Sequence, residues 1–136
     1  VLDGQGGGVG RALIARLVEQ LPQARIRAVG TNAAATQAML KAGAAEGATG
    51  ENAVVVNAPL ADVIAGPAAI LLPNALLGEI TPAMAQAVGA SRGVKVVVPS
   101  NRCGLLIAGE EQPLRHYLDS CVTLIRQALD GQGGER

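Results

Sequence analysis

The sequence is almost without aromatic residues, because it contains no tryptophan, no phenylalanine and one tyrosine among 136 residues. Hydrophobic residues still make up 49% of the chain, so alanine, valine, leucine and isoleucine have to build the core. No run of basic residues stands out, and 11 lysines and arginines balance 11 aspartates and glutamates. Nucleic-acid binding requires a basic patch or stacking aromatics, and we therefore expect no nucleic-acid partner.

Metal ligands and uninterrupted hydrophobic segments are also scarce. Cys103 and Cys121 lack the spacing of a zinc site and His116 is the one histidine, so no metal is expected. The longest apolar region, residues 53–78, is broken by prolines, asparagines and an aspartate that a lipid-facing helix would not carry. No secretory signal is recognisable at the start. We expect a soluble cytoplasmic protein with reduced thiols and no membrane partner.

What the sequence does contain is a regular alternation of strand and helix patterns. Helices are predicted at residues 9–21, 33–43, 81–89 and 114–129. Strands are predicted up to residue 3 and at 25–30, 52–57, 68–74 and 94–101, with a sixth edge strand at 104–109. Unbroken Val/Ile/Leu strands between helices are typical of parallel sheets covered on both faces.

The predicted fold class is therefore α/β. We expect a three-layer Rossmann-like fold with a mostly parallel sheet of five to six strands. Residues 1–130 would form a single domain, and residues 131–136 a disordered tail.

A glycine-rich stretch joins the first strand to the first helix. Gly4, Gly8 and Gly10 match the GxxxGxG spacing of short-chain dehydrogenases, and no lysine follows as a nucleoside triphosphatase loop requires. Glycines let a backbone approach a phosphate, and the free N–H groups of a helix start favour an anion. Asp3 lies too far back to be expected as a cap. We expect an anion to bind along the loop, rather than a purely structural turn, at Gly4, Gln5, Gly6, Gly7, Gly8, Val9 and Gly10.

Four of the predicted strands end in an asparagine or are followed by one within two residues. Carboxyl ends of parallel strands share one edge, where ligands of open α/β folds bind, and asparagine offers two donors and an acceptor. Asparagine also begins loops well, which is the structural alternative. The expected ligand edge comprises Thr31, Asn32, Asn57, Asn74 and Asn101.

Two features of hydride-transfer enzymes are missing. The acid that holds the ribose of NAD is expected about twenty residues after the loop, but residues 30–32 are Gly, Thr and Asn. Arg25 and Arg27 lie too early to hold a 2′-phosphate, and Tyr117 lacks the lysine of the Tyr-x-x-x-Lys pair. Ordinary hydride transfer is disfavoured, although NAD(P) or another nucleotide remains the expected cofactor class. Weak catalytic candidates are Glu79, Arg102 and Cys103, each of which also has a structural explanation.

The segments DGQGGGVG, GTNAAATQAMLKAGA, GATGENAVVVN, LLGEITPAMA and PSNRC together resemble an uncharacterised bacterial family, a domain of unknown function. The resemblance covers nearly the whole chain. It implies a small cytoplasmic protein with a Rossmann-like core, and it transfers no catalytic residue.

The function expected from the sequence is binding of a nucleotide, dinucleotide or other phosphorylated small molecule at the glycine-rich loop. A non-catalytic regulatory or scaffold domain with a degenerate nucleotide site is one alternative, and a small enzyme of unknown reaction is another. Few charges and the apolar run LLPNALL also predict a homo-oligomer.

Overall fold

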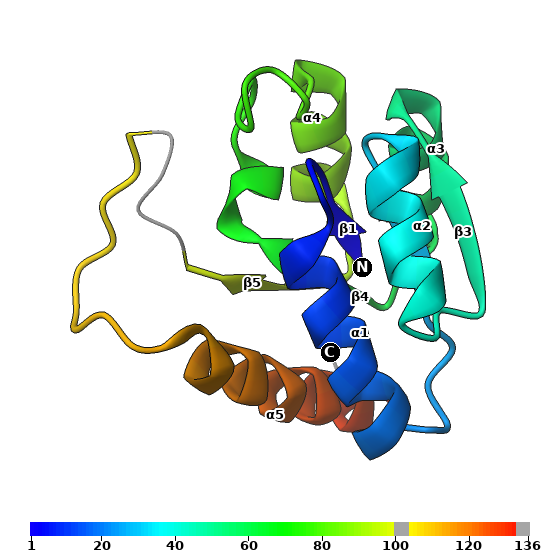
Figure 1. Ribbon diagram of the computed structural model, residues 1–136, viewed down its shortest axis with the longest axis vertical. Helices are drawn as coiled ribbons and strands as arrows, with labels where there is room; N and C mark the ends of the chain where they lie inside the picture. Colours follow the sequence, from blue (N-terminus) through cyan, green and yellow to red (C-terminus); the bar gives the residue numbers. More distant parts are fainter. Residues whose placement is uncertain (100–103, 133–136) are drawn as a thin grey trace.

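The computed structural model describes residues 1–99 and 104–132, in which strands and helices alternate along the chain (Figure 1). The strands are β1 (Leu2–Asp3), β2 (Arg27–Gly30), β3 (Glu46–Thr49), β4 (Val63–Pro67) and β5 (Val94–Val98). The helices are α1 (Gly8–Gln20), α2 (Ala33–Lys41), α3 (Glu51–Asn57), α4 (Pro82–Ala90) and α5 (Leu114–Gln132). Two short 3₁₀ turns, η1 (Ala58–Leu60) and η2 (Ala68–Leu71), flank β4.

The strands form two parallel sheets. β1, β2 and β3 pair in that order, with Leu2 opposite Val29, whereas β4 pairs with β5, with Val63 opposite Val94. β1 contacts β4 without forming a ladder with it. The α/β class with parallel strands is confirmed. The expected single sheet of five to six strands is not observed, because the five strands of the described residues divide into sheets of three and two.

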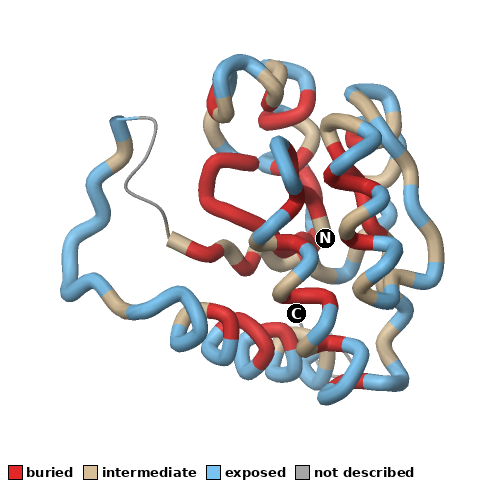
Figure 2. The backbone as a smooth tube through the Cα atoms, viewed as in Figure 1, coloured by how far each residue is buried: buried red, intermediate tan, exposed pale blue. Residues whose placement is uncertain are grey.

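Apolar side chains cover both faces of the strands. On one face α1 and α5 pack against β4 and β5, in a cluster that includes Leu13 and Val122. On the other face α3 and α4 supply residues such as Val88. Ile64 and Ala65, neighbours in β4, belong to opposite clusters, as the alternation of side chains along a strand requires. Figure 2 shows the resulting mixture of buried and exposed positions along α1 and α5.

Four helices form where the sequence predicts them: α1, α2, α4 and α5. The side chain of Asn32 caps α2 by accepting the N–H of Ala35 at 2.9 Å. Thr81 caps α4 by accepting the N–H of Met84 at 3.2 Å, with Pro82 in the first turn. Local capping chemistry therefore fixes where these two helices begin.

The prediction of a strand at residues 52–57 is wrong, because this segment is helix α3. Val54 is buried, whereas Val55 and Val56 are 40% and 53% exposed. A run of valines is typical of a strand covered on both faces, but only one side of this segment is covered. Tertiary packing has overridden the β preference of valine.

Two further strand predictions are wrong. The strand expected at residues 68–74 is displaced, since β4 ends at Pro67 and η2 follows it. Residues 104–109 form no strand, and Leu106 in this segment is 84% exposed. The unpredicted strand β3 has no apolar run, and its residues alternate between partly buried and exposed positions.

Helix α5 extends to Gln132, two residues into the segment expected as a tail, and residues 133–136 lie outside the described residues. None of the helices within residues 1–99 and 104–132 combines the length and the apolar character needed to span a bilayer.

Gly66 allows β4 to lie against β1. A Cβ atom at this position would overlap the carbonyl oxygen of Leu2, which is backbone and cannot rotate away. We therefore expect Gly66→Ala to lower the free energy of unfolding by about 1–3 kcal/mol, measured by urea denaturation. Gly89→Ala is the matched control, because Gly89 lies in α4 with no atom within 4 Å of an added Cβ. Equal denaturation midpoints for the two variants would contradict this account.

Candidate functional site

The carboxylate of Asp3 closes the glycine-rich loop between β1 and α1. Its Oδ1 accepts the N–H of Gly4 at 2.7 Å, and its Oδ2 accepts the N–H of Gly10, in the first turn of α1, at 2.7 Å. The expectation that Asp3 lies too far back to cap this helix is wrong. Glycine at position 10 allows the close approach, since an added Cβ would lie 3.1 Å from the Cβ of Asp3. The sequence signal for this role is a carboxylate at the strand end, directly before the loop.

Two loop residues have left-handed backbone conformations. Gly7, the N-cap of α1, has φ 71°, and an added Cβ would lie 3.0 Å from the Cα of Ala35 in α2. Gln5 has φ 50°. Gly6 and Gly8 differ from Gly7, because neither has a positive φ and neither has an atom within 4 Å of an added Cβ. The space beside Gly6 and Gly8 is therefore open.

Glu79 ties the loop to the carboxyl end of β2. Its Oε1 accepts the N–H of Gln5 at 2.8 Å, the hydroxyl of Thr31 at 2.6 Å and the side-chain amide of Asn32 at 2.9 Å. The structure thus brings together three predicted site residues and one weak catalytic candidate. These hydrogen bonds, that of Thr31 foremost, lower the pKa of Glu79, so its carboxylate is ionised at neutral pH.

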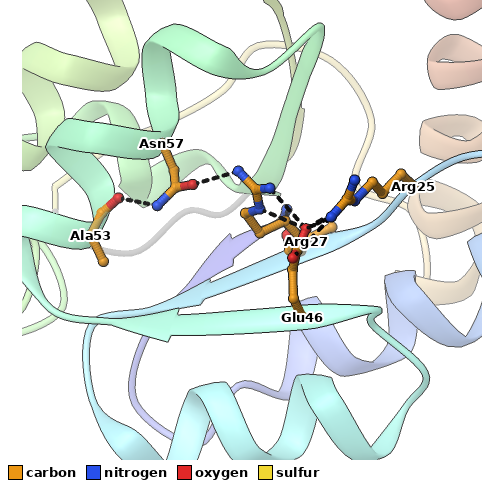
Figure 3. A network of polar contacts seen from close by, with 6 residues as sticks. Arg25, Arg27, Glu46, Ala53 and Asn57 are labelled. Atoms are coloured by element: carbon orange, nitrogen blue, oxygen red, sulfur yellow. Dashed lines mark hydrogen bonds and ion pairs between the residues drawn. The ribbon is translucent and has the colours of Figure 1, made fainter.

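Asn57 lies at the opposite end of the strands. Its Oδ1 accepts a hydrogen bond from Arg27, the first residue of β2, at 2.8 Å, and its amide donates to the carbonyl oxygen of Ala53 (Figure 3). Arg27 and Arg25 both bind Glu46, the first residue of β3, in the same network. The premise that Asn57 ends a strand at the ligand edge is wrong, because the segment that carries it is the helix α3.

The remaining asparagines of the expected edge are Asn74 and Asn101. Asn74 lies in the segment between η2 and α4 with φ 67°, and its N–H donates to the carbonyl oxygen of Ile80. Asn101, Arg102 and Cys103 lie outside the described residues. The predicted shared edge therefore has two described asparagines, Asn32 and Asn74, on loops that follow strands β2 and β4.

A cleft of about 340 Å³ lies beside the glycine-rich loop. The last residues of three strands, Asp3, Pro67 and Val98, contribute to its wall, and most of its other side chains are apolar. The cleft is consequently at the carboxyl ends of the strands. Its residues in the described part of the chain are Asp3, Gly4, Gln5, Gly6, Gly7, Gly8, Val9, Pro67, Ala69, Leu72, Leu76, Val98, Pro99, Leu105 and Leu114.

Burial raises the pKa of Asp3 above its ordinary value of 3.8, against the opposing effect of its backbone hydrogen bonds. At a pH just above 3.8, the folded protein therefore binds more protons than the unfolded chain. Stability from this group is greatest at low pH and falls as the pH rises through the raised pKa.

We expect the Asp3→Asn variant to lack this pH dependence. One of the two N–H groups also loses its acceptor, which should lower the free energy of unfolding by about 1–3 kcal/mol. Urea denaturation between about pH 4 and pH 7 measures both effects. Asp130→Asn, which alters an exposed residue of α5, serves as the control. Parallel pH curves for wild type and Asp3→Asn would disprove the assignment.

Comparison with known families identifies the chain by a model that covers almost all of it. The model of the family described as Domain of unknown function (DUF3842) matches residues 1–134. No curated protein and no solved structure matched the chain. The family match spans all five segments on which the sequence resemblance rests. The chain therefore belongs to the family described as a domain of unknown function, DUF3842.

Proposed function

We propose that the protein binds a nucleotide or another phosphorylated small molecule at the glycine-rich loop. The observation that carries this proposal is the pair of backbone N–H groups of Gly6 and Gly8, for which residues 1–99 and 104–132 supply no hydrogen-bond acceptor. Gly6 and Gly8 both line the cleft, next to the start of a helix of 13 residues. Unpaired N–H groups and the positive end of a helix dipole attract phosphate oxygens.

The arrangement of the strands supports the same site. Because β1 contacts β4, we propose that the two sheets together follow the order β3-β2-β1-β4-β5, the order expected of a Rossmann-like fold. The order reverses between β1 and β4, and ligands of such folds bind outside the carboxyl ends of the strands at this point. The cleft lies there, between the loop and the ends of β4 and β5.

Asp3 limits which anion would bind. Its carboxylate already holds the N–H groups of Gly4 and Gly10 and offsets part of the positive helix end. We therefore expect free phosphate to bind weakly, and a ligand with an apolar group in the cleft to bind more tightly. The same carboxylate favours the alternative of a regulatory or scaffold domain whose nucleotide site is degenerate. Ligand titration separates the two.

The variant Gly8→Val tests the proposal directly. Gly8 lies in α1 without a positive φ, and an added Cβ would have no atom within 4 Å, so valine should leave the fold intact while blocking the approach of a phosphate. We expect the amide resonances of Gly6 and Gly8 to shift in wild-type protein titrated with ADP or pyrophosphate, and binding to weaken at least about tenfold in Gly8→Val.

Gly89→Val is the control, since it makes the same substitution at an open helical position in α4. Wild-type protein whose loop resonances stay unchanged with ADP, NAD⁺ and pyrophosphate would favour the degenerate-site alternative.

We also propose that the chain self-associates through the apolar segment 71–77. Leu77 is 98% exposed and Leu71 is 37% exposed. Leu77 has φ 56°, and asparagine is chosen as its replacement because it tolerates this left-handed conformation. We expect light scattering to give a dimer for wild type and a lower mass for Leu77→Asn. A wild-type monomer at working concentrations would contradict this.

A further inference from the structure

Glu79 lies at the carboxyl end of β2, where the residues adjacent in the sequence include no acid. The residues that follow β2 are Thr31 and Asn32, yet both donate hydrogen bonds to the Oε1 of Glu79, which is 48 positions from Thr31. The third donor is the N–H of Gln5 in the glycine-rich loop. A carboxylate from the segment between η2 and α4 therefore lies at the carboxyl end of β2, beside the first glycine of the loop.

In dinucleotide-binding folds, an acid at the end of the second strand accepts a hydrogen bond from the ribose 2′-hydroxyl. We infer that Glu79 supplies this carboxylate from a distant loop, and that the ligand is a nucleotide whose ribose keeps a free 2′-hydroxyl. The inference rests on the proposed function and specifies its ligand class. The phosphates would lie on Gly6 and Gly8, and the ribose would lie beside Glu79.

The hydrogen bonding of Glu79 suits this role. Its three donors converge on Oε1 and fix the orientation of the carboxylate. Within the described part of the chain, Oε2 receives no hydrogen bond, and this oxygen is left to accept one from a hydroxyl. Ionised Glu79 would also repel a phosphate on the 2′-oxygen.

The arginines near β2 do not offset this repulsion. Recognition of a 2′-phosphate generally uses an arginine close to the end of the second strand. Arg27 begins β2 instead of ending it, and it binds Glu46 and Asn57 at the other end of the strands. Arg25 binds Glu46 as well. The described residues therefore favour an unmodified ribose over a 2′-phosphorylated one.

A purely structural clamp is the competing role for Glu79. The variant Glu79→Gln separates the two roles, because glutamine keeps an amide oxygen for Gln5, Thr31 and Asn32 but replaces Oε2 with a donor and removes the charge. Glu51→Gln is the matched control. Glu51 also accepts a threonine hydroxyl, that of Thr81 at 2.6 Å, and it has no hydrogen bond to the glycine-rich loop within the described residues.

Calorimetric titration of the three proteins with NAD⁺, NADP⁺ and pyrophosphate tests the inference. Wild type and Glu51→Gln should bind NAD⁺ at least about tenfold more tightly than NADP⁺, the effect of one hydrogen bond to a charged group. Glu79→Gln should bind NAD⁺ about tenfold more weakly, lose most of the preference, and bind pyrophosphate as wild type does.

Four results would overturn the inference, and they have different meanings. Equal wild-type affinity for NAD⁺ and NADP⁺, or an unchanged preference in Glu79→Gln, overturns the role of Glu79 alone if pyrophosphate still binds. Loss of pyrophosphate binding together with NAD⁺ binding in Glu79→Gln assigns Glu79 to the clamp. Wild-type protein that binds none of the three compounds overturns the proposed function as well.

Discussion

The buried carboxylate of Asp3 holds both ends of the glycine-rich loop, and the other features of the site depend on the loop conformation that results. Its two oxygens accept the N–H groups of Gly4 and Gly10, the first and last glycines of the loop. The N–H of Gln5 then reaches Glu79, and Gly6 and Gly8 line the cleft. Asp3, a residue of β1, thus caps α1, and the loop needs no capping side chain of its own.

The two ends of the strands have different chemistry. At the amino ends of β2 and β3, Arg25 and Arg27 bind Glu46 and lower its pKa, and Asn57 completes the network. The two arginines therefore share one carboxylate. At the carboxyl ends, backbone N–H groups, two carboxylates and an apolar cleft lie together. The amino ends also border a larger cavity, of about 580 Å³, whose lining includes Arg27, Glu46 and Asn57. The proposed site differs from that cavity in its backbone N–H groups, which are unpaired within the described residues.

Sequence patterns predict the features that depend on near neighbours. The caps at Asn32 and Thr81 are local, and the helices after them are predicted correctly. The valines of α3 mislead because burial depends on what packs over them, which no local pattern contains. The candidate site likewise combines a local feature with a contact between distant segments. The glycine-rich loop is visible in the sequence, whereas the contact of Glu79 with Thr31 depends on the path of a segment 48 positions away.

The scarcity of aromatic residues has a consequence for optical spectroscopy. Tyr117 is the one tyrosine and tryptophan is absent, so the near-ultraviolet signal of the chain comes almost entirely from this residue. Its hydroxyl accepts the N–H of Gln112 at 2.8 Å, and its ring packs against the cluster formed by α1, α5, β4 and β5. Tyrosine emission therefore reports the docking of α5. An unfolding curve recorded this way will coincide with one from far-ultraviolet circular dichroism only if α5 leaves the strands in the same cooperative step as the remainder of the chain.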